Sequence, residues 1–263
     1  MPLKGTTRLI GMIGDPIAKA RTPALLNPRI AAAGADLAIV PLHIPAGAFG
    51  TVFPALLTLG NMAGFIVTYP FKEGCLAFAD RISTGARLVG GLNAMRREED
   101  GTWTADIFDG VGLLNAVKAQ HDPRGARVLL IGAGGAGRAI AVSFAEAGAA
   151  AITVAELDDA RADGLVSGLV AAFPGCVIRR GPPHAAGHDI VVNATPVGMN
   201  PDDGLPGEVG DFAAGMTVVD IVPAPAPTAL LRKASAEGAA TIAGSAMTDG
   251  QATALLRFFG IEE

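Results

Sequence analysis

The stretch Val128-Leu129-Leu130-Ile131-Gly132-Ala133-Gly134-Gly135-Ala136-Gly137-Arg138 places an apolar run directly before a glycine-rich turn. Gly132 allows a tight turn from a strand into a helix, Gly134 lets a pyrophosphate approach the backbone, and Gly137 lets the helix pack on the strand. The unpaired N–H groups at the start of that helix face the phosphate charge. A second apolar run ends at Glu156, at the distance typical of an acid that binds ribose. The segment therefore predicts a dinucleotide-binding domain.

Short apolar runs alternate with helical patterns on both sides of this stretch. The expected strands of the first series are 9–13, 38–42 and 64–67, and its expected helices are 23–33 and 46–59. The second series begins at Val128 and continues with helices 139–147, 159–172, 228–237 and 248–259 and strands 151–155, 190–193 and 217–221. Such alternation predicts an α/β fold with mostly parallel sheets, in two domains with a cleft for chemistry between them.

Composition limits the function classes. The chain has 263 residues, half of them hydrophobic, and a net charge of −5 without a Lys/Arg-rich stretch. We therefore expect a globular protein that binds neither nucleic acid nor an anionic membrane surface. Cys75 and Cys176 stand in unrelated contexts, so buried thiols are favoured over a disulfide, a metal site or a nucleophile. No leader or transmembrane run is recognisable, and the expected location is the cytoplasm.

Two residues outside the glycine-rich turn are candidates for proton chemistry. Lys72 follows an expected strand in Thr68-Tyr69-Pro70-Phe71-Lys72-Glu73, where Pro70 can open a helix and where ligands gather in α/β sheets. Taken alone, a solvated surface lysine is the more frequent role. Asp109 closes Asp106-Ile107-Phe108-Asp109, in which Asp106 could equally be the important acid and turn chemistry explains both. The residues alone leave these alternatives open.

Several separate segments, taken in order, favour a functional role for Lys72 and Asp109. They are residues 14–23, 67–72, 91–93, 109–112, 193–199 and 247–251, together with the glycine-rich turn. Together they resemble the shikimate dehydrogenase family, and the resemblance covers nearly the whole chain. It implies a two-domain α/β enzyme of the shikimate pathway for aromatic amino acids. Such an enzyme transfers a hydride reversibly between a nicotinamide cofactor and a cyclic hydroxy acid, namely shikimate, quinate or a relative, which forms the 3-keto acid.

The resemblance also assigns residues to roles. Lys72 and Asp109 match the catalytic pair at the reacting oxygen, where a lysine held near a carboxylate can relay the hydroxyl proton. The expected substrate-binding residues are Thr22, Thr68, Asn93 and Gln251. The expected cofactor-binding residues are Gly132, Ala133, Gly134, Gly135, Ala136, Glu156, Asn193, Thr195, Pro196, Gly244 and Met247, and no metal site is expected.

The same resemblance sets the domain boundaries. It implies a substrate-binding catalytic domain over residues 1–109 and a Rossmann domain over residues 110–245. The C-terminal helix, residues 246–263, is expected to pack back on the first domain.

The substrate end departs from the family pattern. Ala20 replaces one of two usual serines that meet the substrate carboxylate, which leaves Thr22 as the remaining hydroxyl donor. Further departures are Ile66 for an Asn, Ile107-Phe108 for Asn-Thr, and Pro223 for a Tyr. Lys19 and Arg21 are candidate carboxylate partners, although each is more often a solvated cation. Shikimate itself is therefore expected to bind poorly, because a lost donor to a desolvated carboxylate costs about 1.5 to 3 kcal/mol.

The end of the second expected strand bears on the choice of cofactor. Glu156-Leu157-Asp158 stands where family members that use NADP typically have Asn-Arg-Thr. A 2′-phosphate would bring negative charge against these acids, so we expect NAD to be preferred over NADP. A dinucleotide-binding sensor with a remodelled, non-catalytic pocket is the alternative function. The expected partner is a small cyclic hydroxy acid, and the oligomeric state stays open, a homodimer included.

Overall fold

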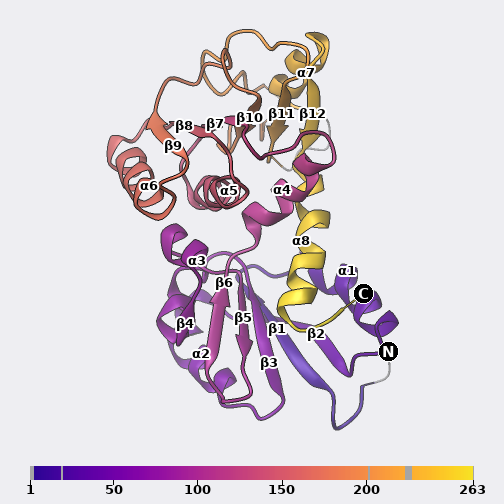
Figure 1. Ribbon diagram of the computed structural model, residues 1–263. Helices are drawn as coiled ribbons and strands as arrows, with labels where there is room; N and C mark the ends of the chain where they lie inside the picture. Colours follow the sequence, from indigo (N-terminus) through magenta and orange to yellow (C-terminus); the bar gives the residue numbers. More distant parts are fainter. Residues whose placement is uncertain (1–2, 19, 201, 223–226, 263) are drawn as a thin grey trace. The chain divides into compact units, whose positions relative to one another are not determined.

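The computed structural model describes residues 3–18, 20–200, 202–222 and 227–262, and the chain divides into two compact units. The first unit comprises Met1–Phe108 and Ala252–Glu263, and the second comprises Asp109–Gln251. Each unit holds one six-stranded sheet with helices packed around it (Figure 1). The predicted α/β class with mostly parallel sheets is therefore confirmed.

The first sheet has the strand order β2-β1-β3-β5-β6-β4. β1 runs parallel to both β2 and β3, whereas β5 is antiparallel to its neighbours β3 and β6. The strands are β1 (Arg8–Gly14), β2 (Leu37–His43), β3 (Met62–Val67), β4 (Arg81–Ile82), β5 (Ala94–Arg97) and β6 (Trp103–Asp106). The helices of its chain segment are α1 (Thr22–Ala32), α2 (Phe49–Leu57) and α3 (Thr84–Val89), with the 3-10 turns η1 (Ala46–Ala48) and η2 (Gly74–Phe78).

Both faces of the first sheet are covered, and all six residues of β3 are buried. On one face, Ile10 and Met12 of β1 pack with α1 and with Leu255 near the C-terminus. On the other face, an aromatic cluster forms in which Phe53 of α2 lies edge-on to Phe65 of β3. Continuous apolar runs at the strand positions of the sequence are the cause of this two-sided burial.

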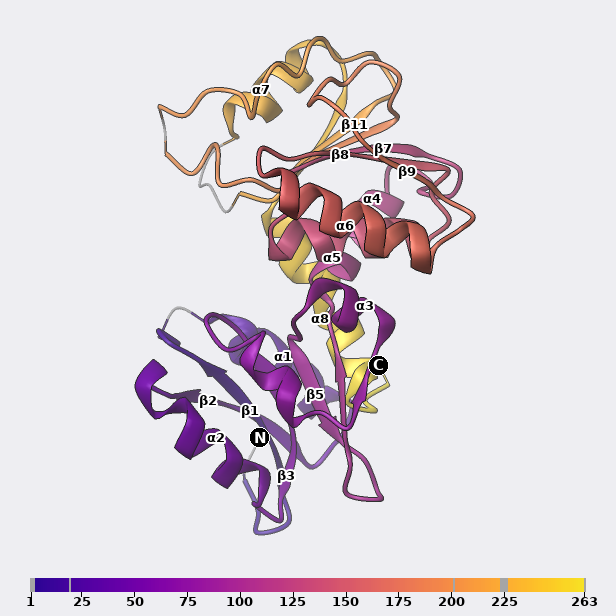
Figure 2. The ribbon, with the colours of Figure 1, turned by 90° about the vertical axis from the view of Figure 1, so that its left-hand side faces the viewer.

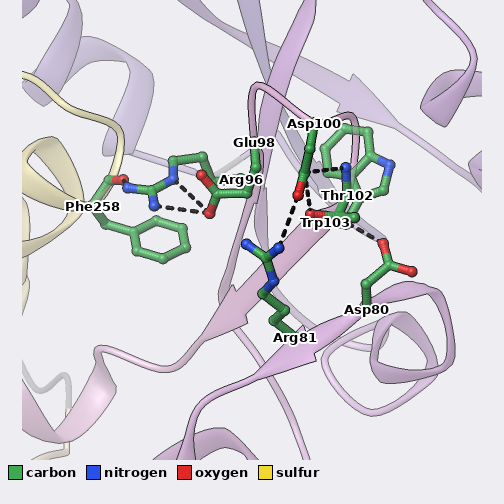
Figure 3. Close-up of polar contacts among 8 residues, drawn as sticks. All are labelled: Asp80, Arg81, Arg96, Glu98, Asp100, Thr102, Trp103 and Phe258. Carbon is green, nitrogen blue, oxygen red and sulfur yellow. Dashed lines mark hydrogen bonds and ion pairs between the residues drawn. The ribbon is translucent and has the colours of Figure 1, made fainter.

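Polar contacts tie the chain's last helix to this sheet (Figure 3). Arg96 of β5 donates to the backbone carbonyl of Phe258, and its guanidinium lies 5.0 Å from the centre of the Phe258 ring. Its second partner is Glu98, at 2.9 Å. The helix in question, α8 (Ser245–Phe258), begins in the second unit and ends in the first.

The second sheet is parallel throughout, with the order β12-β11-β10-β7-β8-β9. α5 and α6 lie on one side of it and α7 on the other (Figure 2). The strands are β7 (Arg127–Ile131), β8 (Ala151–Ala155), β9 (Val177–Arg180), β10 (Ile190–Asn193), β11 (Thr217–Asp220) and β12 (Ala240–Ala243). The remaining helices are α4 (Asp109–Lys118), α5 (Gly135–Glu146), α6 (Asp159–Ala172) and α7 (Ala229–Ala236). None of the helices described is both long and apolar enough to cross a membrane.

The predicted strands and helices are all present, several of them with shifted ends, but the sequence pattern missed several short elements. These are η2, β4, α3, β5 and β6 in the first unit and β9 and β12 in the second. Arg96 and Arg97 in β5, and Arg179 and Arg180 in β9, interrupt the apolar runs by which strands were recognised. The helix expected over 46–59 also begins as the separate 3-10 turn η1.

The aromatic cluster makes the stability of the first unit sensitive to Phe53, whose side chain is fully buried. We expect Phe53→Ala to lower the free energy of unfolding by about 3–5 kcal/mol, because it leaves a cavity. Val52, its neighbour on α2, is 37% exposed, and Val52→Ala is the matched control, with an expected change within about 0.5 kcal/mol. Chemical denaturation measures both, and similar losses in the two variants would contradict this account of the core.

Candidate active site

The glycine-rich turn connects β7 to α5 in the second unit. Gly132 has a φ of +98°, a left-handed conformation that side chains other than glycine rarely adopt. A Cβ atom on Gly137 would lie 2.1 Å from the carbonyl oxygen of Gly132, so only glycine fits there. By contrast, Cβ atoms on Gly134 and Gly135 would meet no atom within 4 Å. The backbone at the start of α5 is therefore open to a ligand, as phosphate binding requires.

A cavity of about 600 Å³ opens beside this turn. It is lined by Gly132 and Gly134, by the end of β8 with Arg161, and by three loop segments, residues 181–183, 194–197 and 205–207. Five of the expected cofactor-binding residues are in its wall, namely Gly132, Gly134, Glu156, Thr195 and Pro196. A glycine cradle at a helix start, beside a cavity with a carboxylate at the next strand end, fits the ribose and pyrophosphate of a dinucleotide.

Other expected cofactor-binding residues lie around the wall rather than in it. Ala133 donates its backbone N–H to the Glu156 carboxylate at 2.7 Å. Asn193, at the end of β10, is fully buried, and its Oδ1 accepts from the backbone N–H and the hydroxyl of Thr195. Gly244 precedes α8, and a Cβ atom there would lie 2.4 Å from the carbonyl oxygen of Ile221. The backbone N–H of Met247 bonds to the Gly244 carbonyl. Gly135 and Ala136 belong to the first turn of α5.

Glu156 is held in place by local contacts. Its carboxylate accepts from the backbone N–H groups of Ala133 and Asp158, and Arg161 of α6 lies 3.7 Å away. Burial opposes ionisation of Glu156, but these hydrogen bonds and the guanidinium prevail and lower its pKa. Arg161 also lies 3.6 Å from Asp158. The charge at this strand end is therefore mixed rather than purely acidic.

Asp109 is the first residue of α4, also in the second unit. Gln251 of α8 donates from Nε2 to its Oδ1 at 3.0 Å. Glycines allow the surrounding backbones to come close: a Cβ atom on Gly110 would lie 2.1 Å from the carbonyl oxygen of Ala139, and one on Gly112 would lie 2.2 Å from that of Met247. Asp109 and Gln251, an expected catalytic residue and an expected substrate-binding residue, are thus brought together.

Three expected residues gather at the carboxyl ends of β1 and β3 in the first unit. Thr68 donates its backbone N–H to the carbonyl of Ile13. Asn93 is buried, and its Oδ1 accepts the backbone N–H of Phe108 at 2.9 Å. The carbonyl of Lys72 accepts the backbone N–H of Leu92, which ties the turn of Lys72 to that of Asn93. Lys72 is half-buried in a turn before η2, rather than in a helix opened by Pro70.

The remaining candidates of the first unit differ in what surrounds them. Thr22 is the first residue of α1 and is half-buried, and Arg21 before it is exposed. Asp106, the alternative acid, accepts from the hydroxyl of Ser83 at 2.6 Å and from the backbone N–H of Ile107 at 2.7 Å. This carboxylate therefore holds α3 and the end of β6 in place. Lys19 and Pro223 lie outside the described residues. Within the described part of the chain, no group of three His, Cys, Asp or Glu residues is arranged to hold a metal.

Sequence reasoning missed several residues of the cavity wall. Arg161 was overlooked because it lies beyond the end of the expected strand. Asp158 is the N-cap of α6, and Arg161, three residues later on this helix, points back toward Glu156. Pro182 and Pro183 follow β9, a strand that the apolar pattern did not reveal. The signal for Arg161 was available in the helix start itself, since residues three apart on a helix are neighbours.

Comparison with known proteins gives consistent matches. The family model of the shikimate dehydrogenase substrate binding domain matches residues 12–95. "Shikimate dehydrogenase (NADP(+))" of Rubrobacter xylanophilus is 36% identical, covering 93% of this chain and 88% of the relative, and that of Geobacter sp. strain M21 is 35% identical, covering 98% and 92%. The crystal structure of shikimate 5-dehydrogenase from Listeria monocytogenes in complex with shikimate and NAD superimposes with a TM-score of 0.90 at 28% identity, covering 100% of this chain and 95% of that one.

The names of the curated relatives correct one expectation. Both carry NADP(+) in their names, so the preference for NAD over NADP expected from the sequence is wrong. That expectation treated Glu156 as an unopposed acid. In the structure, its carboxylate is engaged by two backbone N–H groups, and Arg161 adds a cation to the same wall of the cavity.

The close approach at the glycine-rich turn leads to a prediction. We expect Gly137→Ala to lower the free energy of unfolding by about 1–3 kcal/mol and to weaken dinucleotide binding, because the methyl group collides with the Gly132 carbonyl. Gly164→Ala on the exposed side of α6, where a Cβ atom meets nothing within 4 Å, is the control and should stabilise by about 0.4–1 kcal/mol. Denaturation and cofactor titration measure both, and a neutral Gly137→Ala would refute the close approach.

Proposed function

Because the chain belongs to the shikimate dehydrogenase family, we propose that it is a dehydrogenase that interconverts a cyclic hydroxy acid and its keto form with NADP as the cofactor. The observation that carries the proposal is the dinucleotide cavity at the glycine-rich turn, in the same unit as the Asp109–Gln251 pair. The sensor alternative gains no support, since the curated relatives are named as enzymes.

The dinucleotide, when bound, supplies the carbon centre that accepts or returns the hydride. The backbone N–H groups at the start of α5 would hold its pyrophosphate, and Glu156 would accept a hydrogen bond from the 3′-hydroxyl of its adenosine ribose, the hydroxyl that NADP leaves free. Leu157, whose side chain is fully exposed, and Pro182 and Pro183 give the cavity apolar wall for the adenine base. These groups orient the cofactor and take no part in bond breaking.

Lys72 and Asp109 are proposed to handle the proton. When a hydride leaves the carbinol carbon, the hydroxyl proton passes to the Lys72 amine, and in the reverse direction the ammonium returns it to the forming alkoxide. Asp109 is the proposed second member of the catalytic pair, and its carboxylate is suited to accept hydrogen bonds from the reacting groups. Gln251 fixes the Asp109 carboxylate through the hydrogen bond to Oδ1.

The substrate is proposed to be held from the first unit. Thr68 and Asn93 stand beside Lys72 and are suited to hydrogen-bond ring hydroxyls. The residues expected to bind the substrate carboxylate provide fewer hydrogen-bond donors. Thr22 supplies a hydroxyl, but Ala20 packs against the apolar cluster that contains Ile66. Shikimate, quinate or a relative with a less polar acid end is therefore the proposed substrate class.

The experiment that tests the function is a substrate panel. Purified protein is offered NADP with shikimate, quinate and related cyclic hydroxy acids, and reduction of the cofactor is followed by absorbance. We expect turnover with at least one of them. Tight binding of NADP without turnover of any acid on the panel would favour the sensor instead.

We predict that Lys72→Ala and Asp109→Asn each lower kcat by about 10²- to 10⁴-fold, because each removes a group from the proton path. NADP affinity should stay within about threefold, since neither residue lines the cavity. Asp106→Asn is the matched control: it should cost stability through Ser83 while kcat stays near that of the wild type. Wild-type turnover in Lys72→Ala, or loss of turnover in Asp106→Asn alone, would reverse the assignment.

The cofactor proposal leads to a prediction for Arg161. We expect Arg161→Gln to raise KM for NADP by about tenfold and KM for NAD by less than about threefold, because the guanidinium is the cation in the cavity wall suited to the 2′-phosphate. Arg180→Gln is the control, since Arg180 bonds Asp159 and Asp163 of the same helix. Equal increases for both cofactors in Arg161→Gln would exclude a role in reading the phosphate.

A further inference from the structure

Asp220 is a buried acid that none of the expected roles uses. It ends β11, is only 1% exposed, and lies beside Asn193 at the end of β10. Burial raises its pKa against the effect of its hydrogen bonds. Its Oδ1 accepts from Nδ2 of Asn193 at 3.0 Å and from the backbone N–H of Val222 at 3.1 Å, and its Oδ2 accepts from the hydroxyl of Thr228 at 2.6 Å.

These contacts decide which way the Asn193 amide points. A carboxylate can only accept, so it binds the NH2 end of the amide and leaves the oxygen end for other partners. The same NH2 group donates to the carbonyl of Val197 at 3.0 Å. The amide oxygen then accepts from the backbone N–H of Thr195 at 3.0 Å and from its hydroxyl at 2.7 Å.

The loop held in this way forms part of the cavity. Residues 194–197 line it, and the hydroxyl of Thr195 accepts the backbone N–H of Val197, which closes the loop on itself. Asp220 does not line the cavity and acts on it only through Asn193. Thr228 completes the arrangement, because the same hydroxyl that donates to Asp220 accepts the backbone N–H of Leu231 at the start of α7.

Strand order determines which part of a dinucleotide this loop can influence. β10 and β11 lie on one side of β7, and β8, which leads to Glu156 and Arg161, lies on the other. A dinucleotide spans the point where strand order reverses, with one nucleotide on each half of the sheet. The loop after β10 therefore belongs to the half opposite the adenosine half at Glu156.

We propose that Asp220 is a positioning residue for the nicotinamide half of the cofactor: it locks the Asn193 amide and thereby shapes the loop over residues 194–197. This inference rests on the proposed use of NADP. It assigns Asp220 a role in binding rather than in packing alone, and the two roles differ in a measurable way. A loss of packing weakens every ligand of the unit, whereas a loss of positioning weakens only ligands that reach the loop.

The experiment compares two ligands by calorimetry. NADP reaches both halves of the sheet, and adenosine 2′,5′-bisphosphate reaches only the adenosine half. We expect Asp220→Ala to weaken NADP binding by about tenfold and binding of the bisphosphate by less than about twofold. Asp220→Asn, which keeps one oxygen for Asn193, should fall between the wild type and Asp220→Ala. An equal loss for both ligands, or no loss for NADP, would overturn the proposal.

Two further variants test the route through Asn193 and guard against misfolding. In a double-mutant cycle, Asn193→Ala combined with Asp220→Ala should weaken NADP little more than either change alone, and additive losses would overturn the proposed route. If Asp220→Ala does not fold, Thr228→Val removes a hydrogen bond to Asp220 while keeping the side-chain shape, and about threefold weaker NADP binding with an unchanged bisphosphate affinity is expected.

Asp189→Asn is the matched control. Asp189 precedes β10 at the opposite end of that strand, and the Arg127 guanidinium, 2.8 Å away, lowers the pKa of Asp189 to about 2. Its loss should reduce stability without changing the ratio of the two affinities, and a changed ratio would count against the proposal. A wild-type protein that binds NADP but oxidises no hydroxy acid would refute the proposed reaction. The role of Asp220 would still be decided by the binding measurements, which do not depend on turnover.

Discussion

The carbonyl oxygen of Ala139 on α5 lies 2.1 Å from where a Cβ atom on Gly110 of α4 would stand. The same constraint recurs where α4 meets α8, since a Cβ atom on Gly250 would lie 2.3 Å from the carbonyl of Gly112. Backbones this close leave no room for side chains, so helix positions are set by main-chain contact rather than by adjustable packing. Asp109, at the start of α4, is therefore held by the same scaffold that forms the glycine-rich turn. Its bond to Gln251 depends on that scaffold.

Much of the fold could be predicted from the sequence because parallel strands buried on both faces need continuous apolar runs. The runs that end at Ile131 and Ala155 in the second unit, and at Val67 in the first, are of this kind. Strands β5 and β9 could not be found in this way. Each carries two arginines, and their pairing depends on neighbours distant in the sequence, which a local pattern does not contain.

The candidate site shows a similar division. Glycine positions were predictable because backbone geometry restricts the residue type, as at Gly132 with its positive φ. The roles of charged residues were harder to predict, because the effect of a charge depends on the partners that folding places beside it. Glu156 appeared in the sequence as one of several acids, but folding places the Arg161 guanidinium 3.7 Å from it. Asp220 lay within the expected strand 217–221, and its significance rests on Asn193 and Thr228, which come from other segments of the chain.

Polar side chains lie at the ends of strands in both units, and the two sets belong to different parts of the chain. In the first unit, Thr68 follows β3 and Asn93 precedes β5, while Ala20 packs against the apolar core cluster that contains Ile66. None of these four residues lines the cavity beside the glycine-rich turn of the second unit. A substitution at any of the four therefore leaves the residues that line this cavity, and their charges, unchanged. With the proposed roles, the substrate class can change through residues of the first unit while the proposed cofactor cavity keeps its residues, because function depends on the site and not on the fold alone.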